Sequence, residues 1–154
     1  MRKFICFAIF FAILNANEIE ISALEFIGDE KKKITYLKGS VDIKRAKDRL
    51  KAKEARIYLD KNNKPETMEA IGNVQFWLTL ENNREVEGVA DKVIYIPKKQ
   101  EYRLIGNVMV DEPLKQNKVR GDKIIILYKE GYINVVGNEK KPAKLIFKLE
   151  KNEK

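Results

Sequence analysis

Apolar and polar residues alternate in several short runs of this chain. Residues 18–22 and 41–44 alternate in this way, and the runs 76–80, 92–96 and 123–128 are rich in β-branched and aromatic residues. A period of two places successive side chains on opposite faces of a strand. These runs therefore predict β-strands that have one face in an apolar interior and the other in water.

Segments rich in turn-forming residues separate the predicted strands, at 60–65, 81–84, 97–100, 113–117 and 130–131. The stretch 44–57 is ambiguous, because its charged residues and alanines suit a helix by propensity. Its alignment with a repeat in the sequence favours a strand, and a strand is the prediction.

That repeat is the phrase Gly-x-Val, at Gly39-Ser40-Val41, Gly72-Asn73-Val74 and Gly106-Asn107-Val108, with a frayed fourth copy at Gly137-Asn138. The glycines are 33 (39 to 72), 34 (72 to 106) and 31 (106 to 137) positions apart. A second small residue follows in each full copy, at Ala52, Gly88 and Gly121. A fixed period of this size indicates stacked units, each too small to bury its own apolar face.

Each unit is predicted to be strand, turn, strand. Stacking gives about a dozen short strands in two curved sheets, like a flattened, twisted jelly roll. A stack of this kind is open at both ends, and its terminal strands carry unpaired backbone groups that partners are expected to cover.

The N-terminus resembles a secretory signal peptide. Arg2 and Lys3 precede an unbroken apolar run at 4–14, and Leu14-Asn15-Ala16 closes it with a small residue. We therefore expect residues 1–16 to be cleaved, which leaves 17–154 as a single domain with a short lysine-rich C-terminal tail. The alternative is an uncleaved membrane anchor, although the run is shorter than the roughly 20 residues that span a bilayer.

The composition excludes several chemistries. The sequence has no histidine, and its one cysteine, Cys6, lies in the predicted signal peptide. Ser-His-Asp and Cys-His catalysis and Cys or His zinc sites are therefore excluded. Carboxylate catalysis stays open but is disfavoured, because the acidic residues are scattered on polar strand faces. We predict a protein that is not an enzyme and has no catalytic residue, metal or cofactor.

The formal charge is +8. A basic exported protein can bind anionic lipids, acidic glycans or nucleic acid. The aromatic residues mostly alternate away from the lysines, which argues against nucleic acid. Plain solubility is the other explanation of the charge.

Two units in the repeat carry a resemblance to a known family. The segments 70–74 with 86–95, and 104–108 with 119–124, contain Gly-Asn-Val followed by Gly-Val-Ala-Asp-Lys-Val or Gly-Asp-Lys-Ile. In this order they resemble the LptA/OstA-like repeat, over roughly residues 19 to 147. The first unit departs from the pattern, with Gly-Ser-Val and Lys-Ala-Lys-Glu-Ala.

The resemblance implies an all-β, open twisted β-jellyroll of stacked short antiparallel strands. It also implies a periplasmic protein that transports lipopolysaccharide or lipooligosaccharide, holding lipid A acyl chains in an apolar groove. The implied partners are lipopolysaccharide, an inner-membrane-anchored protein of the same fold, an outer-membrane receiver and further copies of the chain joined by terminal strand pairing. Alternatives are the anchored partner itself, or a basic β-sandwich that binds acidic glycan or nucleic acid.

The family's pattern points to groove residues on the first mature strand and the middle strands. Carried onto this sequence, these are Ile19, Ile21, Phe76 and Tyr95, and strand parity adds Val74, Leu78 and Val93. Ordinary core packing is the alternative for each. Trp77 is expected on the opposite face from Phe76, and Phe76→Asp is expected to weaken lipid binding without unfolding the protein. The basic residues Lys44, Arg45, Lys47 and Arg49 are candidates for lipid A phosphates, or else form a solvated loop.

Overall fold

The computed structural model describes residues 18–149, and within them it has ten strands and three short 3₁₀ helices. The strands are β1 (Ile19–Ser22), β2 (Glu25–Asp29), β3 (Ile34–Arg45), β4 (Asp48–Leu59), β5 (Pro65–Thr79), β6 (Glu85–Ile96), β7 (Glu101–Glu112), β8 (Asn117–Leu127), β9 (Tyr132–Val136) and β10 (Lys144–Phe147), and the helices are η1 (Glu81–Asn83), η2 (Pro97–Lys99) and η3 (Pro113–Lys115). The predicted signal peptide, 1–16, lies outside the described residues. None of the helices in the described part is long and apolar enough to cross a membrane.

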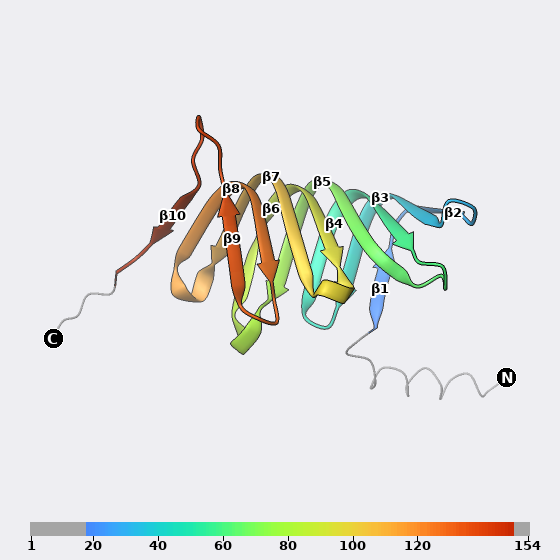
Figure 1. Cartoon of the computed structure of the whole chain (residues 1–154), viewed down its shortest axis with the longest axis horizontal. Helices are drawn as coiled ribbons and strands as arrows, with labels where there is room; N and C mark the ends of the chain where they lie inside the picture. The colour runs from blue at the N-terminus through green and yellow to red at the C-terminus, as the bar shows by residue number, and fades with distance from the viewer. Residues whose placement is uncertain (1–17, 150–154) are drawn as a thin grey trace.

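All ten strands belong to one antiparallel sheet, in which each strand from β3 to β8 pairs with the next (Figure 1). The first strand of this row, β3, pairs with β1 along its C-terminal half and with β2 along its N-terminal half. At the other end, β8 pairs with β10 along its N-terminal half and with β9 along its C-terminal half. The all-β antiparallel fold is confirmed, as is the strand predicted over 44–57, apart from the hairpin turn at Ala46 and Lys47.

The repeated glycines bend the sheet instead of ending its strands. The pairing registers shift after Lys38, Ile71 and Ile105, where each Gly-x pair forms a β-bulge. Both residues of each pair have positive φ, for example +92° at Gly72 and 44° at Asn73. The prediction of short strands in two sheets was therefore wrong in this detail: β3 to β8 have 11 to 15 residues each, because they run through the bend.

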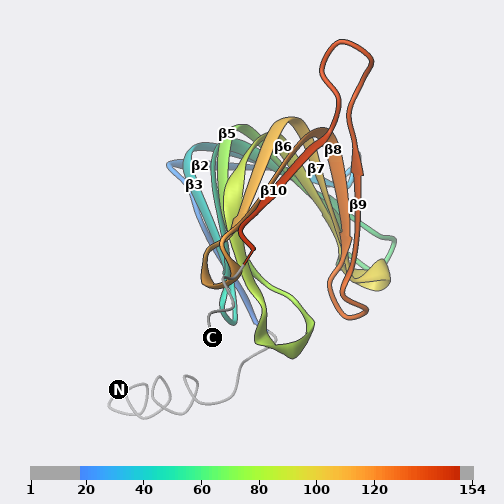
Figure 2. The same cartoon turned by 90° about the vertical axis from the view of Figure 1, so that its left-hand side faces the viewer.

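The bends fold the sheet into two walls that face each other, as Figure 2 shows from the end. The first wall consists of β1, β10 and residues 41–45, 48–52, 74–79, 85–90, 108–112 and 117–121; the second wall consists of β2, β9 and residues 34–38, 54–59, 65–71, 92–96, 101–105 and 123–127. The side chains between the walls form one buried apolar cluster that includes Phe76 of the first wall and Leu104 of the second.

A hydrogen bond from an asparagine side chain to an aspartate side chain occurs twice along the bend. Asn107 donates a hydrogen bond from Nδ2 to Oδ2 of Asp91 at 3.0 Å, and Asn138 donates one to Asp122. The residues are 16 positions apart in both pairs. The frayed fourth copy of the repeat thus keeps this contact, although the chain reverses direction after Asn138 and returns as β10.

Candidate functional site

The interior between the two walls contains the residues predicted for the groove. Val74, Phe76 and Leu78 project from the first wall, Val93 and Tyr95 from the second, and all five are buried. Phe76 has no exposed surface, whereas its neighbour Trp77 is 36% exposed on the outer face. Ile19 and Ile21 on β1 are half-buried and pack against the same cluster. Strand parity therefore assigned the inner face in agreement with the structure, and Val74 and Phe76 in the middle of that face have no exposed surface.

A pocket opens between the walls near β1, and we call it the N-terminal mouth. Its apolar lining comes from both walls, and three charged residues complete it. The lining residues are Ile19, Ile43, Leu50, Met68, Ala70, Val93, Tyr95 and Tyr102, with Arg45, Asp48 and Arg49. The cavity among them is narrow, with a volume of about 20 Å³.

A second and larger opening, the C-terminal mouth, lies between the walls near β9 and β10. It is lined by Val86, Val110, Val119, Ile133, Val135, Ala143 and Leu145, with Arg84, Glu112, Asn117 and Lys144 at its polar positions. Its cavity volume is about 410 Å³. Arg84 donates hydrogen bonds of 2.9 and 3.0 Å to the two carboxylate oxygens of Glu112, and this lowers the pKa of that carboxyl.

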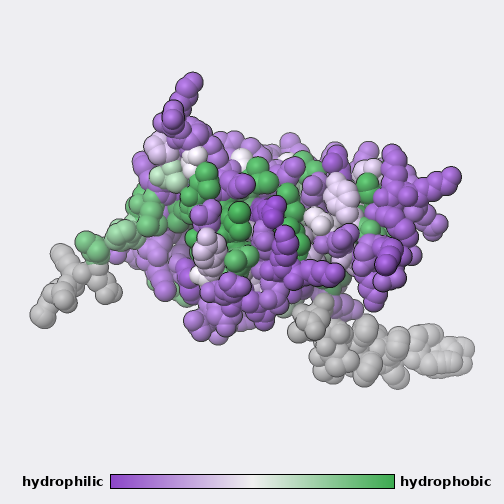
Figure 3. All heavy atoms as spheres, viewed as in Figure 1, coloured by the Kyte–Doolittle hydropathy of each residue, from purple (hydrophilic) through white to green (hydrophobic). Residues whose placement is uncertain are grey.

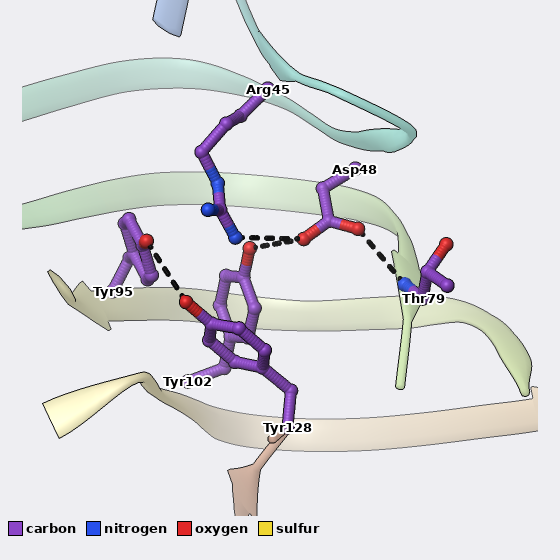
Figure 4. A network of polar contacts seen from close by, with 6 residues as sticks. All are labelled: Arg45, Asp48, Thr79, Tyr95, Tyr102 and Tyr128. Carbon is purple, nitrogen blue, oxygen red and sulfur yellow. Dashed lines mark hydrogen bonds and ion pairs between the residues drawn. The ribbon is translucent and has the colours of Figure 1, made fainter. Parts of the chain in front are cut away.

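Polar side chains meet across the open side of the folded sheet, between its two walls (Figure 4). The Asp48 carboxylate of the first wall accepts hydrogen bonds from the Tyr102 hydroxyl at 2.7 Å and from the Thr79 backbone N–H at 2.9 Å. It also lies 3.4 Å from a guanidinium nitrogen of Arg45. Burial, with the Asp48 charge beside it, raises the pKa of Tyr102 well above its ordinary value, so the hydroxyl stays a donor.

The Arg45 guanidinium lies against aromatic rings of the opposite wall. Its central carbon is 5.2 Å from the ring centre of Tyr95 and 5.4 Å from that of Tyr128, within the range of cation–π attraction. The hydroxyl oxygens of these two tyrosines are 3.2 Å apart. The Glu81 backbone N–H of the first wall also donates a hydrogen bond of 3.0 Å to the Tyr128 carbonyl. We call Arg45, Asp48, Glu81, Tyr95, Tyr102 and Tyr128 the seam residues, because they join the free margins of the two walls.

Arg45 is the member of the predicted basic loop that the structure turns away from solvent. Arg45 points between the walls, and Arg49 donates hydrogen bonds of 3.0 and 2.7 Å to the carboxylate of Asp42. Lys44 and Lys47 are exposed. The seam itself was missed, although the 33-residue spacing from Tyr95 to Tyr128 (95 to 128) matches the repeat and was a signal that they occupy equivalent places.

The two ends of the sheet have free edges with exposed apolar side chains. At the N-terminal end these are Leu24, Phe26 and Ile27; at the C-terminal end they are Tyr132, Val136, Leu145, Ile146, Phe147 and Leu149. Figure 3 shows apolar residues at the end of the molecule where β10, the edge strand of the first wall, lies. Each edge thus offers strand pairing together with apolar contact.

Comparison with protein families gives a match over residues 20–132 to the family described as LptA/(LptD N-terminal domain) LPS transport protein. The chain belongs to this family. The match covers the bends at Gly39, Gly72 and Gly106 and strands β2 to β8 in full, which explains why the Gly-Asn-Val phrases resembled the family's repeat.

The fold matches that of LptH from Pseudomonas aeruginosa, described as the LptA homologous periplasmic component of the conserved lipopolysaccharide transport device. The TM-score is 0.77, over 88% of this chain and 98% of that one, and 14% of the residues are identical. At this identity the similarity is one of fold. A search of curated protein sequences found no match.

Proposed function

We propose that this protein carries lipopolysaccharide through the periplasm, with the acyl chains held between the two walls. The observation that carries the proposal is an apolar interior with a mouth at each end, in a sheet of a lipopolysaccharide-transport family. Each buried CH₂ group contributes about 0.8 kcal/mol, so the acyl chains supply most of the affinity. Groove residues are Ile19, Ile21, Val74, Phe76, Leu78, Val93 and Tyr95, joined by Val119, Ile133 and Val135 at the C-terminal mouth. The transport needs no chemical step by this chain.

The two free edges support an assembly that continues the groove. We propose that β1 and β2 at one end, and β9 and β10 at the other, pair with strands of neighbours. The neighbours are further copies of this chain, an inner-membrane-anchored protein of the same fold and an outer-membrane receiver. Retention of residues 1–16 would make this chain the anchored member, and N-terminal sequencing of the exported protein distinguishes the two.

Binding to intact and deacylated lipopolysaccharide tests the proposal. We expect the purified protein to bind fluorescently labelled lipopolysaccharide, with lipid A as an effective competitor. Deacylated lipopolysaccharide, which keeps the sugars and phosphates, should compete at least about 100-fold less well, because removal of even a few CH₂ groups at about 0.8 kcal/mol each costs that much affinity. Equal competition by the deacylated form would contradict the proposal and favour a protein that binds acidic glycan.

A further inference from the structure

The two walls are connected in different ways at the bend and at the seam. At the bend, the backbones of β3 to β8 run continuously from one wall to the other. At the seam, the cross-wall contacts are the Tyr102–Asp48 hydrogen bond, the Arg45 contacts with Tyr95 and Tyr128, and one backbone hydrogen bond of 3.0 Å from Glu81 N–H to the Tyr128 carbonyl. The seam is therefore the margin at which the walls can separate, with the bend as a hinge.

The interior between the mouths has no room for an acyl chain while the seam is closed. Val74 and Phe76 of the first wall have no exposed surface, and the same holds for Leu104 of the second wall and Val108 of the first. Protein interiors are packed as densely as organic crystals, so an added chain needs new volume. Because the bend is covalently continuous, that volume is created by moving the walls apart at the seam.

The seam contacts are incompletely satisfied. Among the side chains of residues 18–149, Arg45 Nε is a buried donor without an acceptor. A buried polar network with an unmet donor adds little to the stability of the closed state. The cost of removing the Arg45 charge from water offsets the attraction of Arg45 to Asp48 and to the aromatic rings. A polar cleft with Lys47, Asn83 and Lys129 lies over the seam on the solvent side, so the contacts can be reached from outside. The seam is thus closed by bonds that water or a polar headgroup can replace.

We propose that the seam residues form a latch, which lipid must open before it occupies the middle of the interior. In the closed state, acyl chains reach only the C-terminal mouth, because the N-terminal mouth is narrow and is itself lined by the seam residues Arg45, Asp48, Tyr95 and Tyr102. When the latch opens, Tyr102 and Asp48 separate, the walls part about the glycine bend, and the buried apolar face becomes the groove. This inference rests on the proposed lipid-carrying function and adds a gated route of entry along the side of the sheet, as distinct from threading through the ends.

A disulfide across the seam tests the latch directly. A Cβ built on Gly131 of the second wall's β8–β9 turn would lie 3.9 Å from the Glu81 Cβ of the first wall's η1. Disulfides have Cβ atoms roughly 3.5–4.5 Å apart, so the double substitution Glu81→Cys, Gly131→Cys suits a bridge. Cys6→Ser removes the chain's one natural cysteine. The single variants Glu81→Cys and Gly131→Cys control for the side-chain changes and for the strain of a non-glycine residue at φ +68°.

Loading with fluorescently labelled lipopolysaccharide is measured for the oxidised and the reduced double variant. We expect the oxidised protein to load at least about tenfold less lipid, with recovery on reduction, and the single variants to be insensitive to reductant. Equal loading in both states would overturn the latch and leave the proposed function intact. Absence of loading by the reduced variant, the single variants and the unsubstituted protein alike would overturn the proposed function and the latch with it.

A weakened latch gives the opposite result and does not depend on a disulfide. Tyr102→Phe combined with Tyr128→Phe removes the hydroxyl that bonds Asp48 across the seam and the one that bonds Tyr95 within the second wall, and keeps both rings. Loss of one or two hydrogen bonds is expected to raise the rate of loading about tenfold. Tyr36→Phe, on the outer face of the second wall, is the matched control and should leave the rate unchanged. An unchanged or slower rate in the double variant would count against the latch.

Discussion

Replacement of Phe76 by alanine is expected to lower the free energy of unfolding by about 3–5 kcal/mol, the usual cost of emptying a buried aromatic site. The Phe76 side chain has no exposed surface and lies in the buried apolar cluster between the walls. Its ring also covers Gly88 of the neighbouring strand, where Cζ would lie 2.7 Å from an added Cβ. The lost contacts therefore affect two adjacent strands.

Trp77→Ala is the control, because Trp77 follows Phe76 on the same strand and faces outward. We expect it to cost about 1 kcal/mol. The free energy of unfolding of both variants is measured by urea denaturation with circular dichroism as the signal. Tryptophan fluorescence is unsuitable, because Trp77 is the sole tryptophan and the control variant lacks it. Similar losses at the two positions would contradict the assignment of faces.

The burial of Phe76 also changes an expectation from the sequence. Phe76→Asp was predicted to weaken lipid binding and leave the fold intact. A carboxylate at a site without exposed surface has no water and no partner, so we now expect this substitution to unfold the protein. Lipid contacts are better tested at the C-terminal mouth, where Val119, Ile133 and Val135 are half-buried.

Gly88→Ala is the second substitution with a large expected effect, about 3 kcal/mol or more of lost stability. A Cβ at this position would lie 2.0 Å from the Met109 backbone oxygen and 2.7 Å from the Phe76 ring. The backbone oxygen belongs to the paired strand β7 and cannot rotate away. The strands must therefore separate or the ring must leave its site, and either change disturbs the core.

Gly28→Ala provides a matched comparison within the same sheet. Gly28 lies on the edge strand β2, and no heavy atom comes within 4 Å of its added Cβ. The free energy of unfolding of the Gly28→Ala protein should change by less than about 0.5 kcal/mol, as for other surface substitutions. Thermal unfolding of the two variants, measured in parallel, checks the prediction. A Gly88→Ala protein as stable as Gly28→Ala would mean that β6 and β7 are not packed as described.

The repeat and the alternation predicted β1 and segments of β3 to β8, whereas β2, β9 and β10 were not among the predicted strands. The family's pattern assigned the inner face to Phe76, and alternation then placed Trp77 on the outer face. The length of the strands was not predictable in the same way. A glycine that ends a strand and one that bends it are alike in sequence, and the difference is whether the pairing continues beyond it.

The seam could not be derived from local patterns. Tyr102 and Asp48 are 54 positions apart and meet because the sheet folds over on itself. Arg45 has the same sequence context as a residue in a solvated hairpin, and its inward direction follows from the rings on the opposite wall. For a similar reason, parity did not separate the packed interior at Val74 from the half-buried mouth at Ile19, since both are inner-face residues and their exposure depends on the distance between the walls.

The central claim is that lipid lies between the walls, and site-specific photo-crosslinking in cells that make lipopolysaccharide tests it most directly. Val135 lines the C-terminal mouth, and its neighbour Val136, of the same residue type, is 43% exposed on the outer face. With a photo-crosslinking amino acid at each position in turn, the account predicts a lipopolysaccharide adduct at Val135 and none at Val136. Adducts at Val136 alone, or at neither position in folded protein, would contradict it.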